Sequence, residues 1–133
     1  MSAVTMPAPA PAPAPARTSP SSARVELVAE FTALPGNEAE VEALLAELVM
    51  AVRAEPGCLV FDAFAVTDGP PVAELPDDAM PAGRRFVVVE AYRDAAAFAA
   101  HLAQPHGARF NDALGQLIAE PGGSVLRFLR PVG

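Results

Sequence analysis

His101 and His106, the only two histidines of the chain, lie five residues apart and are the first candidates for acid–base chemistry. Imidazole is the side chain that gains and loses a proton most readily near neutral pH. Pro105 separates the two, and because proline favours the first turn of a helix, it predicts that a new helix begins there. Any proton transfer by histidine must therefore take place in this short region.

Further polar side chains on either side of the histidines could assist such chemistry. Glu90 and Tyr92 end an apolar run and alternate on one face of a predicted strand, so Glu90 could hold a histidine ring in one tautomer. Asn111 follows on the next helix and could donate its amide to an oxyanion. The candidate catalytic residues are His106, His101, Asn111, Tyr92 and Glu90. The structural alternative is that the histidines simply join helix to strand through Glu90.

Aromatic side chains recur in the same segments and predict a small apolar cavity between sheet and helices. We interpret five phenylalanines as candidate substrate-binding residues, namely Phe61, Phe64, Phe86, Phe98 and Phe110, with Phe61 and Phe64 as alternatives for one position. Plain core packing is the competing interpretation of these aromatic residues.

The composition excludes several other functions. The net charge is −7, which argues against nucleic acid and anionic membranes as partners. All nine basic residues are arginine, so no side-chain amine is available for Schiff-base chemistry. Cys58 is the only cysteine and is interpreted as a small buried hydrophobe rather than a nucleophile. No stretch approaches the roughly 18 apolar residues of a membrane span, so a cytoplasmic protein is expected.

Motifs for cofactors are also missing from the sequence. It contains no glycine-rich nucleotide loop, P-loop or nucleophile elbow. Two histidines five apart do not match the i, i+4 spacing of a helical zinc pair, and no third ligand is evident. We therefore expect neither a metal nor another cofactor.

The hydrophobic pattern predicts six main elements in the order β-α-β-β-α-β. Strands are predicted over about 24–33, 58–66, 85–92 and 124–130. A helix is predicted from Asn37, with Glu40 completing a capping box, to about Ala54. The second helical segment, which Asp94 caps, is split at Pro105. This order is that of an α+β, ferredoxin-like fold with a four-stranded antiparallel sheet.

Two segments fall outside this pattern. Residues 1–23 contain an unbroken Pro-Ala alternation from Pro7 to Ala16 and are expected to form a disordered or semi-rigid tail, leaving one domain over residues 24–133. Residues 67–83 join two strands and contain four prolines, which is long for a hairpin loop. A lid, a dimer contact and a tolerated surface insertion all remain open for this segment.

Three short motifs carry a resemblance to a known family: Glu55-Pro56-Gly57-Cys58, then Glu90 with Tyr92 and Asp94, then His101-Leu102 with Pro105-His106. In this order they resemble the antibiotic biosynthesis monooxygenases, small cofactor-free oxygenases that include quinol monooxygenases. The resemblance covers about residues 24–130. It implies a homodimer whose two sheets pack into an α/β barrel. It also implies monooxygenation of a quinol, anthrone-like or other electron-rich phenol by O2.

Rival functions remain on the same scaffold. Haem-degrading relatives have a tryptophan near the place of His101 and an iron-binding histidine near Asn111 or Asp112; this chain has neither, which argues against haem chemistry. An isomerase or cyclase could use the same base without oxygen. A non-catalytic dimeric binding or accessory domain is the third alternative, and the Pro-Ala tail favours it because such tails can tether partners.

Overall fold

The computed structural model of the chain describes residues 23–72 and 80–133. The expected tail therefore lies almost wholly outside the described residues, as does the middle of the 67–83 connection. The elements, in chain order, are β1 (Val25–Thr32), α1 (Glu38–Arg53), β2 (Cys58–Ala65), β3 (Arg85–Tyr92), α2 (Ala95–Leu102), α3 (Pro105–Leu114) and β4 (Val125–Leu129). The predicted order is confirmed, including the split of the second helical segment.

The four strands form one antiparallel sheet in the order β2-β3-β1-β4, which confirms the ferredoxin-like α+β fold. β1 and β3 are central, and Leu27 on β1 lies opposite Glu90 on β3. Phe61 on β2 also lies opposite Glu90. Because directly paired residues point to the same face, these three side chains share one face of the sheet.

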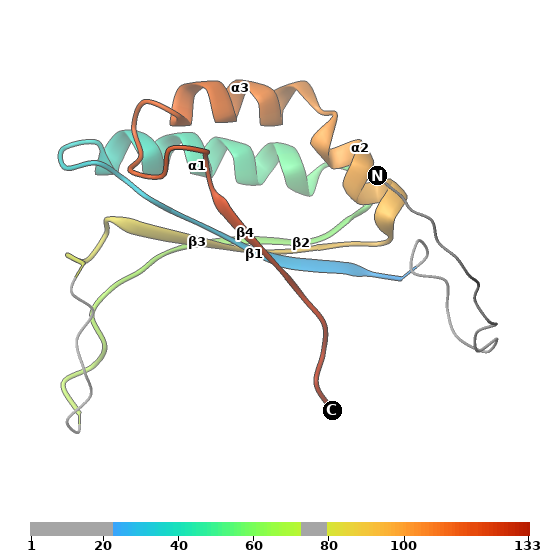
Figure 1. Ribbon diagram of the computed structural model, residues 1–133, viewed down its shortest axis with the longest axis horizontal. Helices are drawn as coiled ribbons and strands as arrows, with labels where there is room; N and C mark the ends of the chain where they lie inside the picture. Colours follow the sequence, from blue (N-terminus) through green and yellow to red (C-terminus); the bar gives the residue numbers. More distant parts are fainter. Residues whose placement is uncertain (1–22, 73–79) are drawn as a thin grey trace, which may run out of the picture.

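The helices cover one face of the sheet. α1 and α3 lie side by side above it, and α2 lies at one end, next to the carboxyl end of β3 (Figure 1). The described parts of the 67–83 connection and the C-terminal residues extend to the side of the sheet away from the helices (Figure 1). The described residues thus form two layers, and none of their helices covers the second face of the sheet.

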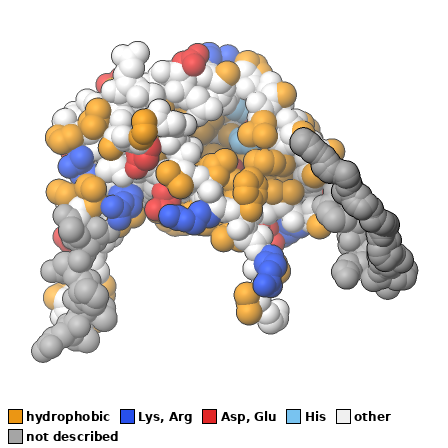
Figure 2. Space-filling model, viewed as in Figure 1, with side chains coloured by type: hydrophobic (Ala, Val, Ile, Leu, Met, Phe, Trp, Pro, Cys, Tyr) orange, Lys and Arg blue, Asp and Glu red, His pale blue; other side chains and the backbone are white. Residues whose placement is uncertain are grey.

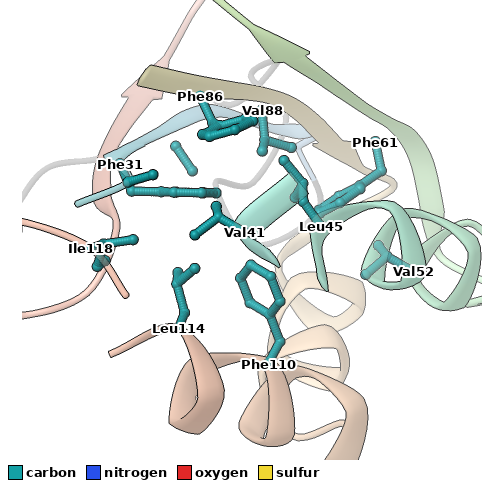
Figure 3. Packing of buried hydrophobic residues seen from close by; sticks show 12 residues of the cluster. Phe31, Val41, Leu45, Val52, Phe61, Phe86, Val88, Phe110, Leu114 and Ile118 are labelled. Carbon is teal, nitrogen blue, oxygen red and sulfur yellow. The ribbon is translucent and has the colours of Figure 1, made fainter. Parts of the chain in front are cut away.

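The core lies between these layers and is rich in phenylalanine. Phe31 stacks on Phe86 with ring centroids 5.7 Å apart and meets Phe110 edge-on at 6.2 Å. Figure 3 shows Phe110 pointing from α3 toward the sheet, next to Val41 and Leu45 of α1. Burying each such side chain contributes about 1.5–3 kcal/mol, so these contacts are what hold the helices against the sheet.

All three predicted helix starts are confirmed in position, and two of them also in the local feature that was expected to begin the helix. The Asp94 side chain accepts a hydrogen bond from the Ala97 N–H at 2.8 Å, and Pro105 occupies the first turn of α3. The capping box at Asn37 is wrong, because Asn37 precedes α1 without a side-chain capping bond. The Glu38 carboxylate instead accepts from the N–H of Gly36, which has a φ of +93°. The Asn37 N–H donates to the Leu34 carbonyl at 2.9 Å, so it does not form the capping-box bond to Glu40.

None of the helices in the described part of the chain is long and apolar enough to cross a membrane. Within the same residues, no group of three or more His, Cys, Asp or Glu side chains is arranged to hold a metal ion.

Candidate active site

The corner between α1 and β2 contains Glu55, the hydrogen-bonding partner of both histidines. The chain leaves α1 at Arg53 and turns through Pro56-Gly57 into β2. Gly57 is buried against α2, and a Cβ placed on it would lie 2.3 Å from the Cβ of Ala97. The Gly57 carbonyl also accepts the Arg93 N–H at 2.9 Å. A glycine here therefore allows α2 to sit directly against the corner.

This close approach brings His101 to Glu55. His101 lies four residues after Ala97 and so on the same side of α2. Its Nδ1 lies 3.0 Å from Glu55 Oε1 and 3.2 Å from Oε2. The Glu55 side chain is only 7% exposed, although it lies in a connection between elements. A carboxylate buried to this degree needs hydrogen-bonding partners.

His106 provides the second partner of the same carboxylate. Its Nε2 lies 2.6 Å from Glu55 Oε2, a charge-assisted distance. Glu55 thus bridges α2 and α3 across 46 and 51 residues of sequence. The two histidines are held together by a third residue rather than by each other.

Glu90 has a different role from the one that the sequence predicted. Its Oε1 accepts the Tyr92 hydroxyl at 2.7 Å and lies 4.0 Å from His101 Nε2. The expectation that Glu90 is the carboxylate that holds a histidine ring is therefore corrected, since Glu55 makes the hydrogen bonds. Glu55 and Glu90 both lie near His101, but of these two carboxylates only Glu55 contacts its Nδ1.

Burial controls the protonation of Glu90 and Tyr92. Desolvation raises the pKa of Glu90 above its ordinary range, and the hydrogen bond from Tyr92 and the nearby His101 partly oppose this effect. Desolvation, together with the adjacent Glu90 charge, raises the pKa of Tyr92 far above its ordinary value. Tyr92 is therefore a neutral hydroxyl donor at every working pH.

Cys58 lies close to the same carboxylates. Burial raises the pKa of its thiol, and the charges of Glu55 and Glu90 raise it further. These causes favour the neutral thiol over the reactive thiolate, in keeping with a packing role.

Aromatic rings fix the His101 imidazole from several sides. Its ring centroid lies 4.8 Å from that of Tyr92, 6.0 Å from Phe98 and 6.2 Å from Phe61. Because these rings come from α2, β2 and β3, the imidazole has little freedom to rotate away from its carboxylates.

A cavity of about 130 Å³ adjoins this imidazole, between the sheet and α3. Figure 2 shows a histidine side chain within a hollow bordered by hydrophobic side chains. The sequence-predicted residues that line the cavity are His101, Glu90, Asn111, Phe61, Phe98 and Phe110. Leu102, Ser124 and Leu126 also contribute to the lining, so β4 borders the cavity as well.

The remaining predicted site residues do not line this cavity. His106 lines a separate groove between α1 and α3, next to Glu47 and Arg109. Tyr92 is completely buried, and Phe86 stacks on Phe31 in the core. Phe64 pairs with Val87 on the face away from the helices and is 54% exposed. Of the two alternatives Phe61 and Phe64, it is Phe61 that lies at the cavity.

Glu55 is the site residue that sequence reasoning missed. It belongs to the Glu-Pro-Gly-Cys motif on which the family resemblance rests, yet it was given no chemical role. The available signal was an acidic residue next to a Pro-Gly pair and just before a strand in which Asp62 is the only charged residue. An acid in such a place must either face solvent or serve a buried partner.

Comparisons with known proteins agree with this architecture. The family model described as antibiotic biosynthesis monooxygenase matches residues 24–113. No match was found among curated proteins.

Several solved structures are similar over most of the chain. PA3566 from Pseudomonas aeruginosa is 26% identical with a TM-score of 0.64, covering 85% of this chain and 98% of that one. A structure described as an antibiotic biosynthesis monooxygenase is 25% identical with a TM-score of 0.64, covering 82% and 99%. Rv0793 from Mycobacterium tuberculosis is 24% identical with a TM-score of 0.65, covering 84% and 97%, a likeness of fold. Since the family model spans more than half of the sequence, the chain belongs to the antibiotic biosynthesis monooxygenase family.

Proposed function

We propose that the protein is a cofactor-independent monooxygenase that oxidises a quinol or another electron-rich phenol with O2. The observation that carries the proposal is a cavity with apolar walls and one buried polar corner, made by His101 and Glu90. Membership of the family and the name of the similar monooxygenase structure support oxygenase chemistry at the family level.

The reaction would begin with removal of a phenolic proton. His101 is the candidate base, because it lines the cavity whereas His106 lines the outer groove. The O–H bond of the quinol breaks, and its proton passes to the imidazole. The resulting anion is electron-rich enough to give one electron to O2, which leaves a semiquinone radical beside superoxide.

Recombination of this radical pair forms a peroxide on a ring carbon. Loss of water from the peroxide yields a hydroxylated quinone, so one oxygen atom of O2 enters the product and the other leaves as water. Asn111 is the candidate amide donor to the developing oxyanion, and the phenylalanine walls keep bulk water away from the radical pair.

The size of the cavity narrows the choice among substrates. Its volume of about 130 Å³ is close to that of cavities in proteins that hold a single benzene ring. A three-ring anthrone would have to extend through the mouth past Leu102 and Leu126. We therefore favour a single-ring quinol over an anthrone-like substrate.

The proposal includes a homodimer formed through the open face of the sheet. By strand register this face carries Val28, Val89 and Val87 on the two central strands, with Phe64 and Leu129 on the edges. Val89, Leu129 and Phe64 are 38%, 48% and 54% exposed. By the same register Glu30, Asp62 and Arg127 also lie on this face, so its apolar residues are interspersed with charges. Exposed apolar side chains spread over four strands are typical of an interaction site.

An oxygen-electrode screen tests the proposed function. Metal-stripped protein without added flavin is offered single-ring quinols, naphthoquinols and anthrones, and quinone formation is followed in parallel. We expect oxygen uptake and quinone formation in a ratio of one to one, fastest with a single-ring quinol. Product formation without oxygen uptake would indicate the isomerase or cyclase alternative, and the absence of turnover on every phenol would contradict the proposal.

A further inference from the structure

Glu55 lies at the meeting point of three segments and contacts both imidazoles at once. Its Oε1 is 3.0 Å from His101 Nδ1, and its Oε2 is 2.6 Å from His106 Nε2. An ionised carboxylate has only acceptors, so each ring nitrogen that faces it must carry a hydrogen. The position of Glu55 therefore fixes the tautomer of both rings.

The consequence differs for the two histidines. In neutral His101 the hydrogen stands on Nδ1, which leaves the lone pair on Nε2. That nitrogen is on the side of Glu90, at 4.0 Å, and so on the side of the cavity. In His106 the nitrogen bound to Glu55 is Nε2, and the ring borders the groove between α1 and α3. One ring is presented to the cavity, while the other serves to hold the carboxylate.

We infer that Glu55 is a positioning residue that presents the unprotonated Nε2 of His101 to the cavity, and that His106 helps to hold the Glu55 carboxylate in place for this role. This inference rests on the proposed function only for the identity of the proton donor. The tautomer and the sharing of the carboxylate are properties of the protein without substrate.

The two histidines depend on this carboxylate in different ways. Without Glu55, His101 loses the acceptor that holds its hydrogen on Nδ1. Without His106, both Glu55 oxygens still lie within hydrogen-bond distance of His101 Nδ1, so the tautomer should persist.

Other titratable groups face the same imidazole and must be considered. Glu90 and Tyr92 approach from β3, and Cys58 lies on β2 near Glu55. Glu47 and Arg109 border the groove beside His106. Burial raises the pKa of Glu90, which makes it a weaker counter-charge than an ordinary glutamate. Of these two carboxylates, Glu55 is therefore the one that interacts more strongly with His101.

Histidine-resolved ¹⁵N NMR of the substrate-free full chain tests the inference. In the wild type we expect the hydrogen of neutral His101 on Nδ1 and that of His106 on Nε2. In Glu55→Gln the side-chain amide has one acceptor oxygen and one donor nitrogen, so only one of the two rings can keep its hydrogen toward this residue, and the other should change its tautomer. His106→Ala should leave the hydrogen of His101 on Nδ1, because the contacts of Glu55 with this nitrogen remain. Glu42→Gln, which removes an exposed carboxylate from α1, is the matched control and should leave both tautomers unchanged.

The same variants are then compared in turnover. Glu55→Gln should lower kcat/KM for oxygen consumption, because the lone pair of His101 is less firmly held toward the cavity, whereas Glu42→Gln should not. If Glu55→Gln fails to fold, the tautomers of the wild type and of His106→Ala still decide the matter. Wild-type His101 with its hydrogen on Nε2, or tautomers that Glu55→Gln leaves unchanged in both rings, would overturn the inference. The expected tautomers without oxygen uptake on any phenol would leave it standing and refute the proposed function instead.

Discussion

The nitrogen atoms of His101 reach two different carboxylates, whereas the contact of His106 is with one, and this difference predicts unequal roles. His101→Ala should lower kcat/KM for oxygen consumption by about a hundredfold or more, the usual scale for loss of a general base. His106→Ala should cause a clearly smaller loss, because its ring lines the outer groove. Melting followed by circular dichroism checks that both variants stay folded. Equal losses would contradict the assignment of the base, and unfolding of both would favour a purely structural role.

The buried Glu90 makes a prediction about stability and pH. Because burial raises its pKa above the ordinary 4.5, the folded protein holds this proton more tightly than the unfolded chain does. Between the two values the folded state binds more protons, so the free energy of unfolding falls as the pH rises. Glu90→Gln cannot titrate but keeps an acceptor for the Tyr92 hydroxyl. Its stability relative to wild type should therefore increase with pH through this interval and then level off.

Urea unfolding of both proteins at several values from about pH 4 to pH 8 measures this difference. Contributions of the other titratable groups largely cancel in the comparison. A difference that stays flat over the whole range would mean that Glu90 titrates in the folded protein as it does in the unfolded chain.

At this scale the sequence predicted which residues line the cavity better than it predicted their contacts. The two histidines, Asn111 and three of the phenylalanines were recognisable from type and spacing, and the cavity brings most of them together. The contact between Glu55 and His101 spans 46 residues and depends on how closely α2 packs on the corner. The spacing of residues in the sequence does not predict the distance in space between side chains of two separate segments.

At the scale of elements, the features that depend on neighbouring residues were predictable. The Asp94 cap and the proline start of α3 each involve a few consecutive residues, and both are confirmed. The Asn37 capping box is wrong, since the Asn37 N–H donates to the Leu34 carbonyl at 2.9 Å rather than to the Glu40 carboxylate. Local competition between two acceptors is beyond a pattern that considers each motif separately.

Gly57 determines how closely α2, which carries His101, can approach the corner that contains Glu55. Because a Cβ here would lie 2.3 Å from that of Ala97, Gly57→Ala must push α2 away from the corner. Overpacking of this kind costs typically about 1–3 kcal/mol in the free energy of unfolding. The displacement should also lengthen the contact between His101 and Glu55, so that turnover falls together with stability.

Gly122→Ala is the matched control for this substitution, since its added Cβ would meet no atom within 4 Å. Its unfolding free energy should change by no more than about 0.5 kcal/mol. Urea unfolding and oxygen consumption are measured on both variants. A Gly57→Ala protein as stable and active as the Gly122→Ala protein would show that α2 does not depend on this close approach.

At the scale of the molecule, the two faces of the sheet have unequal cover. Among residues 23–72 and 80–133, the helices lie over one face and no helix lies over the other (Figure 1). Charged residues on this face are partly paired, as Arg127 is with Glu30 at 2.7 Å, and so are compatible with a close contact. A second copy related by a two-fold axis would cover the same apolar patch on both molecules at once.

Val89 is the residue with which to test the proposed dimer. It lies on the central strand β3, opposite Val28 on one side and Asp62 on the other, and is 38% exposed. Val89→Glu would bury two carboxylates in a two-fold interface without a partner, which disfavours association strongly. In one chain the new side chain faces solvent, so the fold should survive at a cost of about 1 kcal/mol or less.

Light scattering at micromolar concentration should give twice 13.7 kDa for the wild type and 13.7 kDa for the Val89→Glu variant. Met50→Glu, at a 72% exposed position on α1, should remain dimeric. A wild type with the monomer mass would refute the dimer, and a dimeric Val89→Glu would place the interface on another face.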